Sequence, residues 1–395
     1  RLVTATLTPT QLLQVSRFDE VLFIDRWSPM APDMNNVRVL GGANYIETAG
    51  NYRGAGVRGE ILDCGFNRER FIPHVDFASR PLLEHGGPVS SANHGASTSG
   101  IIFGDGTGSA NARGLLPLGQ GIVADWDNVG IDGPNRYTHT GELVNPSLTW
   151  KAVFQSTSGG SAQTTEYTTI SAEMDDILFD FDIVHCQSQS NTGNQLSRPQ
   201  AWAKNTISVG AVKHFNNSNS FLDTSDDRWC GGPTSCGVPS GSCASIGPAA
   251  DGRVKPDLAG FYECIHTTRC CSSPGSCSGC SSCSSTSYTP PDFGGTSAAT
   301  PIVCGHAGLV MEMWADDSDG DGKNIFGVPV VSCDPLIENC VFKRRPHMST
   351  AKAMLINTAN QYDWVSGPLP NRDIDRFKQG WGFPSVKNLM TSAAK

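Results

Sequence analysis

The chain carries little charge and has no long apolar run. Only 17% of its 395 residues are charged, and 29 basic against 38 acidic residues give a formal net charge of −9 at pH 7. No basic stripe is visible, so we expect neither a nucleic acid nor an anionic membrane as a partner. No apolar stretch approaches the roughly 20 residues that span a bilayer. No internal repeat is visible, and we expect an already processed chain without a secretory leader that acts as a monomer.

Cysteine, by contrast, is abundant. An even number of clustered cysteines is typical of disulfides formed in an oxidising compartment, so we expect a secreted, extracellular protein. Zinc binding by a CxxCxxC run is the alternative, but no histidine or second CxxC pair lies at a zinc-ribbon distance from it. Eight of the fourteen cysteines lie within about fifty residues rich in Ser, Gly and Pro: Cys236, Cys243, Cys264, Cys270, Cys271 and the run Cys277, Cys280 and Cys283.

Other cysteines lie outside this cluster. Cys333 and Cys340 bracket a short loop and are predicted to pair with each other. Cys64, Cys186 and Cys304 lie in segments predicted to be buried, where free thiols behave as small hydrophobic side chains. We therefore take these three as candidate free thiols.

Short apolar runs alternate with helical patterns along the chain. This alternation predicts an α/β fold with a mostly parallel central sheet covered by helices on both faces. Residues 126–148 are polar without a strong period and are predicted to be a long surface excursion. Strands are predicted at residues 59–65, 121–124, 153–156, 180–186 and 206–212, and helices at 167–179 and 350–359.

Composition divides the chain into an N-terminal arm and one large domain. Residues 1–26 alternate like a small strand–helix–strand unit, in which Thr8 and Pro9 make a helix start. A Pro-containing linker then opens the domain, which spans residues 27–395. Within it, the Ser/Cys-rich stretch 264–288 is predicted to be an exposed insertion held by disulfides.

One stretch stands out for its chemistry: Gly294-Gly295-Thr296-Ser297-Ala298-Ala299-Thr300-Pro301, followed by the apolar run 302–314. The glycines allow a sharp turn, Pro301 suits the first turn of a helix, and a helix that is apolar on all sides is buried. The pattern places Ser297 at the N-terminus of a buried helix, where backbone N–H groups favour negative charge. Taken alone, Ser297 could simply cap that helix.

An acid and a histidine precede this serine. Asp63 closes an apolar run, and the carboxyl ends of parallel strands are where sites form in such sheets. His94 opens a run of small residues that would let a helix pack closely on its neighbours. Taken alone, Asp63 could cap the next turn and His94 could lie on a surface loop. His85 lacks this context, because no small-residue helix follows it.

Asp63, His94 and Ser297 together make the set that acyl transfer needs. A serine hydroxyl becomes a good nucleophile when an imidazole takes its proton, and a buried carboxylate fixes the tautomer of the imidazole and stabilises the imidazolium. The order acid, histidine, serine is the one found in subtilisin.

The sequence resembles the subtilisin-like serine proteases, or subtilases. Gly295 to Pro301 matches their serine motif at all but the variable position after Ser. His94-Gly95-Ala96-Ser97-Thr98-Ser99-Gly100 shares the His, both glycines and their spacing with the histidine motif but lacks its second histidine and its Val-Ala pair. Ile61-Leu62-Asp63-Cys64-Gly65 resembles the aspartate motif, with Cys where Ser or Thr is usual.

The resemblance runs from residue 58 to about 390 and implies a three-layer subtilisin-like fold. It further implies a secreted serine endopeptidase that acts on proteins or peptides through an acyl-enzyme, with Asp63, His94 and Ser297 as its triad. Residues 1–26 resemble the tail of a subtilase propeptide. Two alternatives remain: an inactive member of the family that serves as a binding protein, and an esterase-like acyl hydrolase.

Two further positions carry over from the family. Asn191 falls where subtilases place their oxyanion asparagine, although Gln189-Ser190 replaces the usual Ala-Gly before it. Thr157, Ser158 and Gly159 align with the strand that pairs with the substrate backbone and walls the P1 pocket, with Ser158 in place of a larger apolar residue. Peptide binding by strand addition is the expected mode.

Acids alternate downstream of the serine stretch. Asp317, Asp319 and Asp321 precede Gly322, which is the pattern of the first half of a calcium loop. The twelfth position is Val328 instead of the bidentate glutamate of an EF-hand. We therefore expect no EF-hand but a structural calcium site within residues 316–322, with a solvated acidic turn as the alternative.

Overall fold

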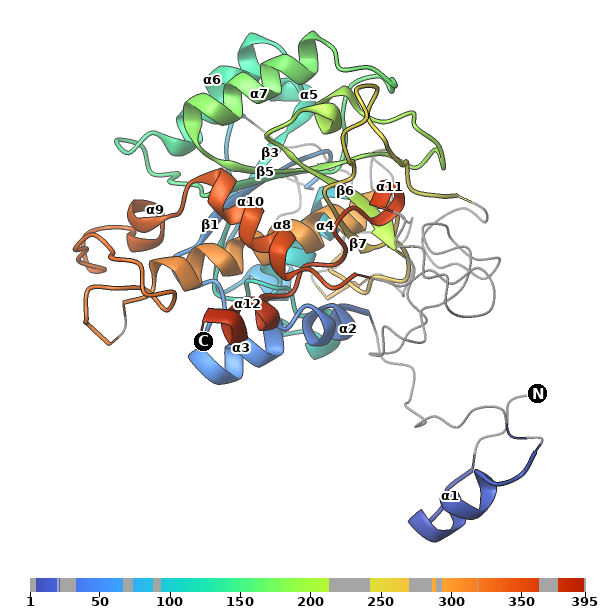
Figure 1. Cartoon of the computed structure of the whole chain (residues 1–395). Coiled ribbons are helices and arrows are strands. Elements are labelled where there is room, and N and C mark those ends of the chain that lie inside the picture. The colour runs from blue at the N-terminus through green and yellow to red at the C-terminus, as the bar shows by residue number, and fades with distance from the viewer. Residues whose placement is uncertain are drawn as a thin grey trace.

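A seven-stranded sheet, parallel at every pairing, forms the centre of the domain (Figure 1). The strand order is β2–β3–β1–β4–β5–β6–β7. The strands are β1 (Arg58–Asp63), β2 (Leu83–Glu84), β3 (Gln120–Asp125), β4 (Phe154–Thr157), β5 (Val184–Ser188), β6 (Ile207–Val212) and β7 (Leu258–Phe261). The computed structural model describes residues 5–19, 21, 33–66, 74–87, 94–212, 242–269, 286–288, 293–317, 319–361 and 376–393.

The strand order reverses direction at β1. From β1 the chain proceeds to β2 and β3 on one side and then crosses to β4, which pairs with β1 on the other side. Open parallel sheets bind their ligands at the carboxyl ends of the strands beside such a switch point. Asp63 is the last residue of β1, so the fold places its carboxylate at this location.

Helices cover both faces of the sheet, as Figure 1 shows. Alternate residues of β3 enter different apolar clusters: Val123 belongs to the large cluster that contains α8, and Ile122 to the cluster beneath α6 and α7. On the α8 side lie α2 (Asp33–Leu40), α3 (Ala43–Gly50), α4 (His94–Phe103), α8 (Thr296–Ala315), α10 (Met348–Thr358) and α12 (Val386–Ala393). On the other lie α5 (Trp126–Val129), α6 (Pro134–Val144) and α7 (Thr169–Phe181). This is the predicted three-layer α/β architecture.

Shorter helical turns complete the domain: η2 (Val75–Phe77), η3 (Ala110–Ala112), η4 (Pro199–Trp202), α9 (Cys340–Arg344) and α11 (Arg376–Gln379). In the N-terminal arm, α1 (Pro9–Val15) begins with a Thr8 capping box and has no buried side chain. Figure 1 shows it apart from the sheet. The strand expected before it is not formed by residues 5–7, and most of the strand expected after it lies outside the described residues.

Of the helices that the structure describes, α8 is the most deeply buried. Nearly all of its side chains are inaccessible, including Ile302, Val303 and Leu309. Its apolar surface on all sides explains this position, because such a helix is stable only inside a core. The helix begins at Thr296, so the expectation that Pro301 occupies its first turn was wrong, and Pro301 lies inside the helix.

The segment 126–148 differs from its prediction, because it forms α5 and α6 instead of a surface excursion. Arg136, His139, Thr140 and Leu143 of α6 are buried at helical spacing. Three of these four are polar, so a search for apolar periodicity misses the helix. Their burial is compensated by polar side chains on the facing strands, which are described below.

The predicted strand 180–186 also begins later than expected. Helix α7 continues to Phe181, and Asp182 ends it in a left-handed conformation with φ 45°. Residues with a short polar side chain tolerate this conformation, so the strand β5 starts only at Val184.

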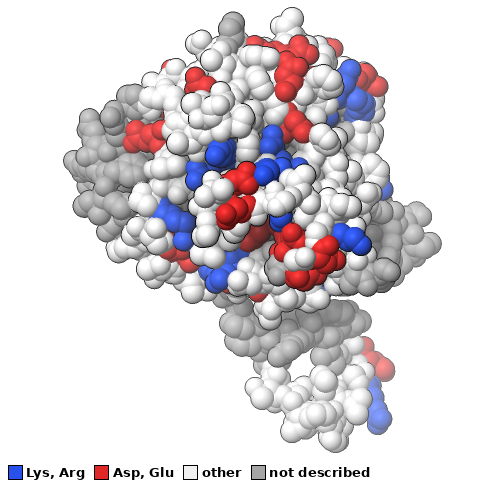
Figure 2. Space-filling model, turned by 90° about the vertical axis from the view of Figure 1, so that its left-hand side faces the viewer, with Lys and Arg blue, Asp and Glu red and all other residues white. Residues whose placement is uncertain are grey.

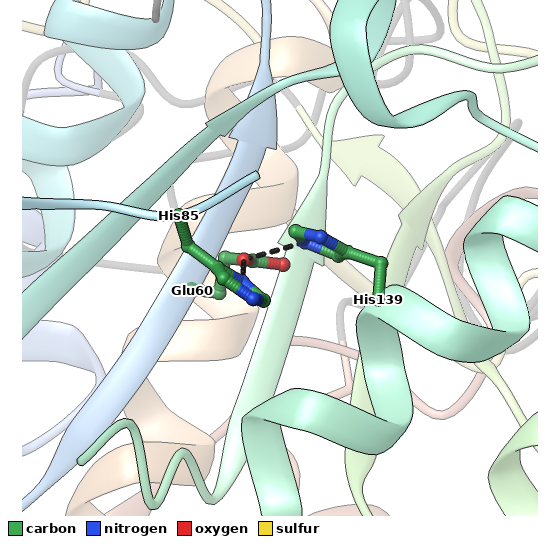
Figure 3. A group of neighbouring side chains, drawn as sticks. All are labelled: Glu60, His85 and His139. Atoms are coloured by element: carbon green, nitrogen blue, oxygen red, sulfur yellow. Dashed lines mark hydrogen bonds and ion pairs between the residues drawn. The ribbon is translucent and has the colours of Figure 1, made fainter. Parts of the chain in front are cut away.

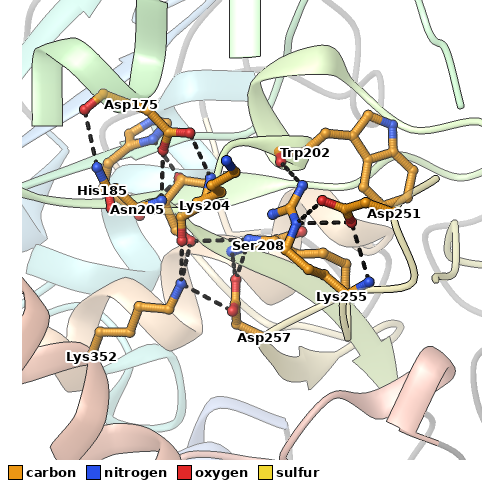
Figure 4. Close-up of polar contacts among 12 residues, drawn as sticks. Asp175, His185, Trp202, Lys204, Asn205, Ser208, Asp251, Lys255, Asp257 and Lys352 are labelled. Atoms are coloured by element: carbon orange, nitrogen blue, oxygen red, sulfur yellow. Dashed lines mark hydrogen bonds and ion pairs between the residues drawn. The ribbon is translucent and has the colours of Figure 1, made fainter. Parts of the chain in front are cut away.

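A buried cluster of charges joins α10 to the sheet (Figure 4). The Asp257 carboxylate accepts hydrogen bonds from the backbone N–H of Ser208 on β6 at 2.8 Å and from Lys255 Nζ at 2.6 Å, and it lies 3.0 Å from Lys352 Nζ on α10. Burial raises the pKa of Asp257, but the two lysines and these hydrogen bonds outweigh burial and hold the pKa below its ordinary value.

The predictions for cysteine are partly confirmed. Cys333 and Cys340 form a disulfide, and Cys186 and Cys304 are free and buried. Cys64 is disulfide-bonded, so its assignment as a free thiol was wrong. It follows the end of β1, where the chain leaves the sheet, whereas Cys186 and Cys304 lie inside β5 and α8.

Two further cysteines, Cys243 and Cys264, are also disulfide-bonded. The possible zinc ligands Cys277, Cys280 and Cys283 lie outside the described residues, as does most of the predicted insertion 264–288.

The surface mixes both signs of charge. On the face shown in Figure 2, acidic and basic side chains are interspersed among neutral ones. Within the described part of the chain, no helix combines the length and apolar character needed to cross a membrane.

Candidate active site

Asp63 and His94 meet at the carboxyl edge of the sheet. Asp63 ends β1 and is fully buried, and His94 is the first residue of α4. His94 Nδ1 lies 2.7 Å from Asp63 Oδ1, which also accepts the backbone N–H of Cys64 at 2.7 Å. The carboxylate therefore fixes the imidazole so that its Nε2 is available for another partner.

The second oxygen of Asp63 is held by a residue that sequence reasoning missed. Thr98 Oγ1 donates to Asp63 Oδ2 at 2.9 Å. Thr98 follows His94 by four residues on α4, and residues at this spacing share a helix face. That spacing is the signal by which Thr98 could have been found.

A second aspartate, at the end of the neighbouring strand β3, has a different role. Asp125 is paired directly with Asp63 at the end of β3. Its carboxylate caps α5 by accepting the backbone N–H of Asp127 at 3.0 Å. The Asp63 carboxylate, by contrast, holds the imidazole of His94.

The environment of His94 favours its protonated form. Burial acts against the imidazolium, but the charge of Asp63 and its hydrogen bond outweigh burial, so the pKa of His94 lies above its ordinary value. The ring of Phe293 contacts the imidazole edge-on at 5.5 Å between ring centres.

Ser297 is the second residue of α8, at the same edge of the sheet. Gly295 precedes the helix with φ 78°, a conformation that disfavours side chains, and its N–H donates to Tyr262 O at 2.6 Å. Backbone N–H groups in the first turn of a helix have no partner inside it. The N–H of Ser297 therefore points out of the helix, beside its own hydroxyl group.

Pro301 and Ser158 are linked through the carbonyl of Ser297. In an unbroken helix, the N–H of residue 301 would donate to Ser297 O, but proline has no N–H. Ser158 Oγ donates to that oxygen instead, at 3.1 Å. The hydroxyl of Ser158 thus fills the gap that Pro301 leaves and ties the start of α8 to the end of β4.

Asn191 contacts the residue next to Ser297. Its Oδ1 accepts the backbone N–H of Thr296 at 2.9 Å and the hydroxyl of Thr296 at 3.2 Å. Because the oxygen of the amide is engaged by these donors, its NH₂ group is the end left for a ligand.

The backbone before Asn191 is unusual. Ser190 has φ 128°, a value that residues with a Cβ rarely adopt. Its carbonyl accepts the N–H of Ser245 at 2.7 Å, and its hydroxyl accepts a bond from Gln163. These contacts hold the conformation that leads into Asn191.

A cleft of about 500 Å³ joins these residues. His94, Asn191 and Ser297 line it, and so do Ser158 and Gly159. Its remaining walls come from residues that sequence reasoning did not select: Trp126, Asp127, Ile131, Gly160, Ser188, Ser190, Arg198 and Thr296. Several of these follow the carboxyl ends of β3, β4 and β5, a position that the strand predictions could have indicated.

The three predicted substrate-binding residues at the end of β4 lie in different surroundings. Ser158 and Gly159 face the cleft, whereas Thr157 is fully buried and its Oγ1 lies 3.1 Å from His185 Nε2. The carbonyl of Gly159 accepts a hydrogen bond from Gln187 on β5 at 2.6 Å. This bond holds the rim of the cleft against the sheet.

The three predicted calcium ligands lie in one loop after α8, away from the cleft residues in sequence. One carboxylate oxygen from each of Asp317, Asp319 and Asp321 lies within 4.8 Å of the others. Asp317 Oδ1 accepts the N–H of Gly322 at 3.0 Å, and its Oδ2 lies 3.1 Å from Arg344.

The link between Ser158 and Pro301 predicts a specific coupling. Ser158→Ala should cost about 1 kcal/mol of unfolding free energy, because Ser297 O loses its donor. In a Pro301→Ala background, residue 301 regains an N–H for that oxygen, so the same change should cost less. Denaturant unfolding of both single variants and of the double variant measures the coupling; equal costs in the two backgrounds would contradict the assignment.

Comparisons with known proteins place this geometry in a family. The model of the subtilase family matches residues 84–382, a stretch that contains His94, Asn191 and Ser297 and begins after Asp63. No curated protein sequence matches the chain significantly.

Solved protease structures share the fold. The prenylagaramide maturation protease PagA has 17% sequence identity and a TM-score of 0.55 over 89% of this chain and 98% of its own. A protease of Pseudoalteromonas arctica has 14% identity and a TM-score of 0.56 over 93% of this chain and all of its own. The patellamide maturation protease PatA has 16% identity and a TM-score of 0.52 over 86% and 97% of the two chains. Since the family match covers well over half of the sequence, the chain belongs to the subtilase family of peptidases.

Proposed function

We propose that this subtilase is a secreted serine endopeptidase that cleaves peptide bonds through an acyl-enzyme intermediate. Membership of the family supports a serine peptidase in general. The single observation that carries the finer assignment is the 2.7 Å contact between Asp63 and His94 at the cleft that Ser297 also lines. Asp63, His94 and Ser297 then form the triad.

The triad would act in two half-reactions. His94 Nε2 takes the proton of Ser297 Oγ as the oxygen attacks the peptide carbonyl, while Asp63 stabilises the imidazolium. The imidazolium gives this proton to the leaving amine, and the peptide C–N bond breaks to leave an ester on Ser297. A water molecule, deprotonated by His94, attacks the ester and releases the acid product as the proton returns to Ser297.

Asn191 and the N–H of Ser297 would stabilise the oxyanion of each tetrahedral intermediate. The amide of Asn191 is oriented by Thr296 before any substrate arrives. A donor fixed in this way needs no reorganisation during the reaction, and in subtilisin itself the loss of one such donor lowers kcat by about 10²–10³.

The substrate would be a peptide or an extended segment of a protein. Ser158 and Gly159 follow the end of β4 and line the cleft. Their backbone could add the substrate as a further strand, which positions the scissile carbonyl beside Ser297.

Disulfides support the proposal of secretion. Cys64, Cys243, Cys264, Cys333 and Cys340 are all in disulfide bonds. Such bonds persist in oxidising compartments, outside the cytosol. We further propose that the enzyme acts as a monomer.

Calcium is the ion we propose for the loop of Asp317, Asp319 and Asp321. The three carboxylates converge, and Ca²⁺ prefers oxygen ligands of this kind. The site would hold the loop that follows α8 in one conformation and so stabilise the end of that helix.

The central prediction concerns Ser297. A fluorophosphonate should label the wild-type protein at this residue near neutral pH. Ser297→Ala should fold normally and should not be labelled. Its turnover should fall to the background rate that substrate binding and the oxyanion hole support without a nucleophile. Mass spectrometry locates the adduct, and peptides blocked at both termini test for internal cleavage. A wild-type protein without an adduct would favour an inactive binding protein, and cleavage of esters alone would favour an acyl hydrolase.

The pH profile tests the role of His94. The neutral imidazole is the form that takes the proton of Ser297, so kcat/KM should fall as pH drops through the pKa of His94, which Asp63 holds above its ordinary value. Asp63→Asn should shift this acid limb to lower pH and reduce kcat by a factor on the order of 10⁴. An acid limb that stays in place in this variant would refute the pairing.

Metal removal tests the calcium loop. After a chelator has removed all bound metal, saturating Ca²⁺ should raise the melting temperature of the wild-type protein, because an ion at about 100 times its Kd contributes about 2.7 kcal/mol. Asp319→Asn should abolish most of this response, whereas Asp176→Asn, at an exposed position on α7, should not change it. The same melting temperature of the chelator-treated protein with and without added Ca²⁺ would rule the site out.

A further inference from the structure

A second cluster of histidine and carboxylate side chains lies on the face of the sheet that α6 covers. Figure 3 shows Glu60 of β1 between His85, which follows β2, and His139 of α6. All three side chains are buried, with exposed fractions of 0%, 3% and 5%. The proposed reaction uses none of them.

One oxygen of Glu60 is the point on which the cluster converges. His85 Nδ1 lies 3.0 Å and His139 Nε2 lies 2.8 Å from Glu60 Oε1. One ligand atom from each of the three residues lies within 4.8 Å of the others. The imidazole rings stack at 3.9 Å between their centres, and the indole of Trp150 packs on His85 at 4.5 Å.

Outer partners orient two of the three residues. His85 Nε2 lies 2.9 Å from Glu142 Oε2, and Gln155 Nε2 donates to Glu60 Oε2 at 2.5 Å. Gln155 in turn accepts a bond from Arg136, which is buried. A carboxylate on the far nitrogen of a histidine is the usual outer partner of a metal ligand, because it fixes the tautomer and makes the near nitrogen more basic.

Two imidazole nitrogens, His85 Nδ1 and His139 Nε2, face the same oxygen of Glu60, and the other nitrogen of His85 faces Glu142. A divalent cation among the three atoms would replace any proton between these two nitrogens and Glu60. His85 would then keep the proton that it donates to Glu142.

We propose that Glu60, His85 and His139 bind a divalent transition-metal ion of the zinc class. Two imidazoles and one carboxylate are ligands that Zn²⁺ takes at about 2.0–2.2 Å, with water in a fourth position. Tetrahedral ligands at that distance are roughly 3.4 Å apart, so each nitrogen needs to move away from Glu60 Oε1 by about half an ångström from its present 2.8 or 3.0 Å. The side chain of Glu142 is 47% exposed, which opens a route from solvent.

The site is separate from the proposed triad although both use β1. Glu60 and Asp63 are three residues apart, and side chains alternate between the faces of a strand. Glu60 therefore faces α6, whereas Asp63 contacts α4 on the other side. An ion at Glu60 would join β1, the end of β2 and α6, and would stabilise the fold instead of taking part in the reaction.

Metal titration of the chelator-treated full chain tests the proposal. Wild-type protein should bind one Co²⁺ at this site with visible d–d absorption bands, and Zn²⁺ should displace it. Zn²⁺ should also raise the melting temperature by on the order of 4 °C. His139→Gln should lose the bands and the shift, while His347→Gln, whose side chain is 83% exposed on the surface, should keep both.

Glu142→Gln provides a second test that leaves all three ligands in place. It should weaken the binding of Zn²⁺ by about 10–100-fold, because only the outer partner of His85 is changed. The proposal is overturned if the wild-type protein shows no d–d bands, or if His139→Gln and Glu142→Gln both bind the ion as tightly as wild type. An ion that binds at the triad or at the acidic loop would give that second result.

Discussion

The burial of α8 against the sheet is the constraint on which the candidate site depends. A helix without a polar face has to lie inside the core, and its N-terminus then emerges where the strands end. Gly295 allows the sharp entry into the helix, and the bond from its N–H to Tyr262 sets the position of the first turn. Ser297 reaches the edge that carries Asp63 because the helix starts there. The apolar core thus positions a polar group at the edge of the sheet.

The two faces of the sheet bury different kinds of side chain. On the α8 face apolar side chains cover the sheet except where Asp257, Lys255 and Lys352 join α10 to it. On the α6 face, Glu60 and Gln155 project from the strands and meet Arg136 and His139. Burial of charge is costly unless each group has partners, and here the partners come from strand and helix together. Helix α6 is therefore held to the sheet by polar contacts as well as by its apolar residues.

Much of the fold and part of the site could be predicted from the sequence. Strands β1, β3, β4 and β6 each contain or adjoin a short apolar run, and α8 is apolar on all sides, so local patterns locate them. Helix α6 could not be found in this way, because its buried face is largely polar and His139 on it depends on Glu60, which lies 79 residues earlier in the chain.

In the candidate site, too, the residues in local sequence motifs could be predicted and the contacts between distant segments could not. Asp63, His94 and Ser297 lie in recognisable local motifs, whereas the walls of the cleft come from loops brought together by the sheet. The partner of Ser158 could not be predicted either, because the bond exists only where Pro301 leaves a carbonyl without its donor inside the helix. Contacts between distant segments are the part of the structure that a local pattern does not contain.

The backbone conformation of Ser190 bears on when the neighbouring side chain of Asn191 becomes ordered. A side chain held at a positive φ raises the free energy of the folded state by about 1–3 kcal/mol. This strain is present in the resting enzyme, next to the amide of Asn191. The ordering of that amide is therefore completed once, when the chain folds, and does not have to be repeated each time a substrate enters the cleft.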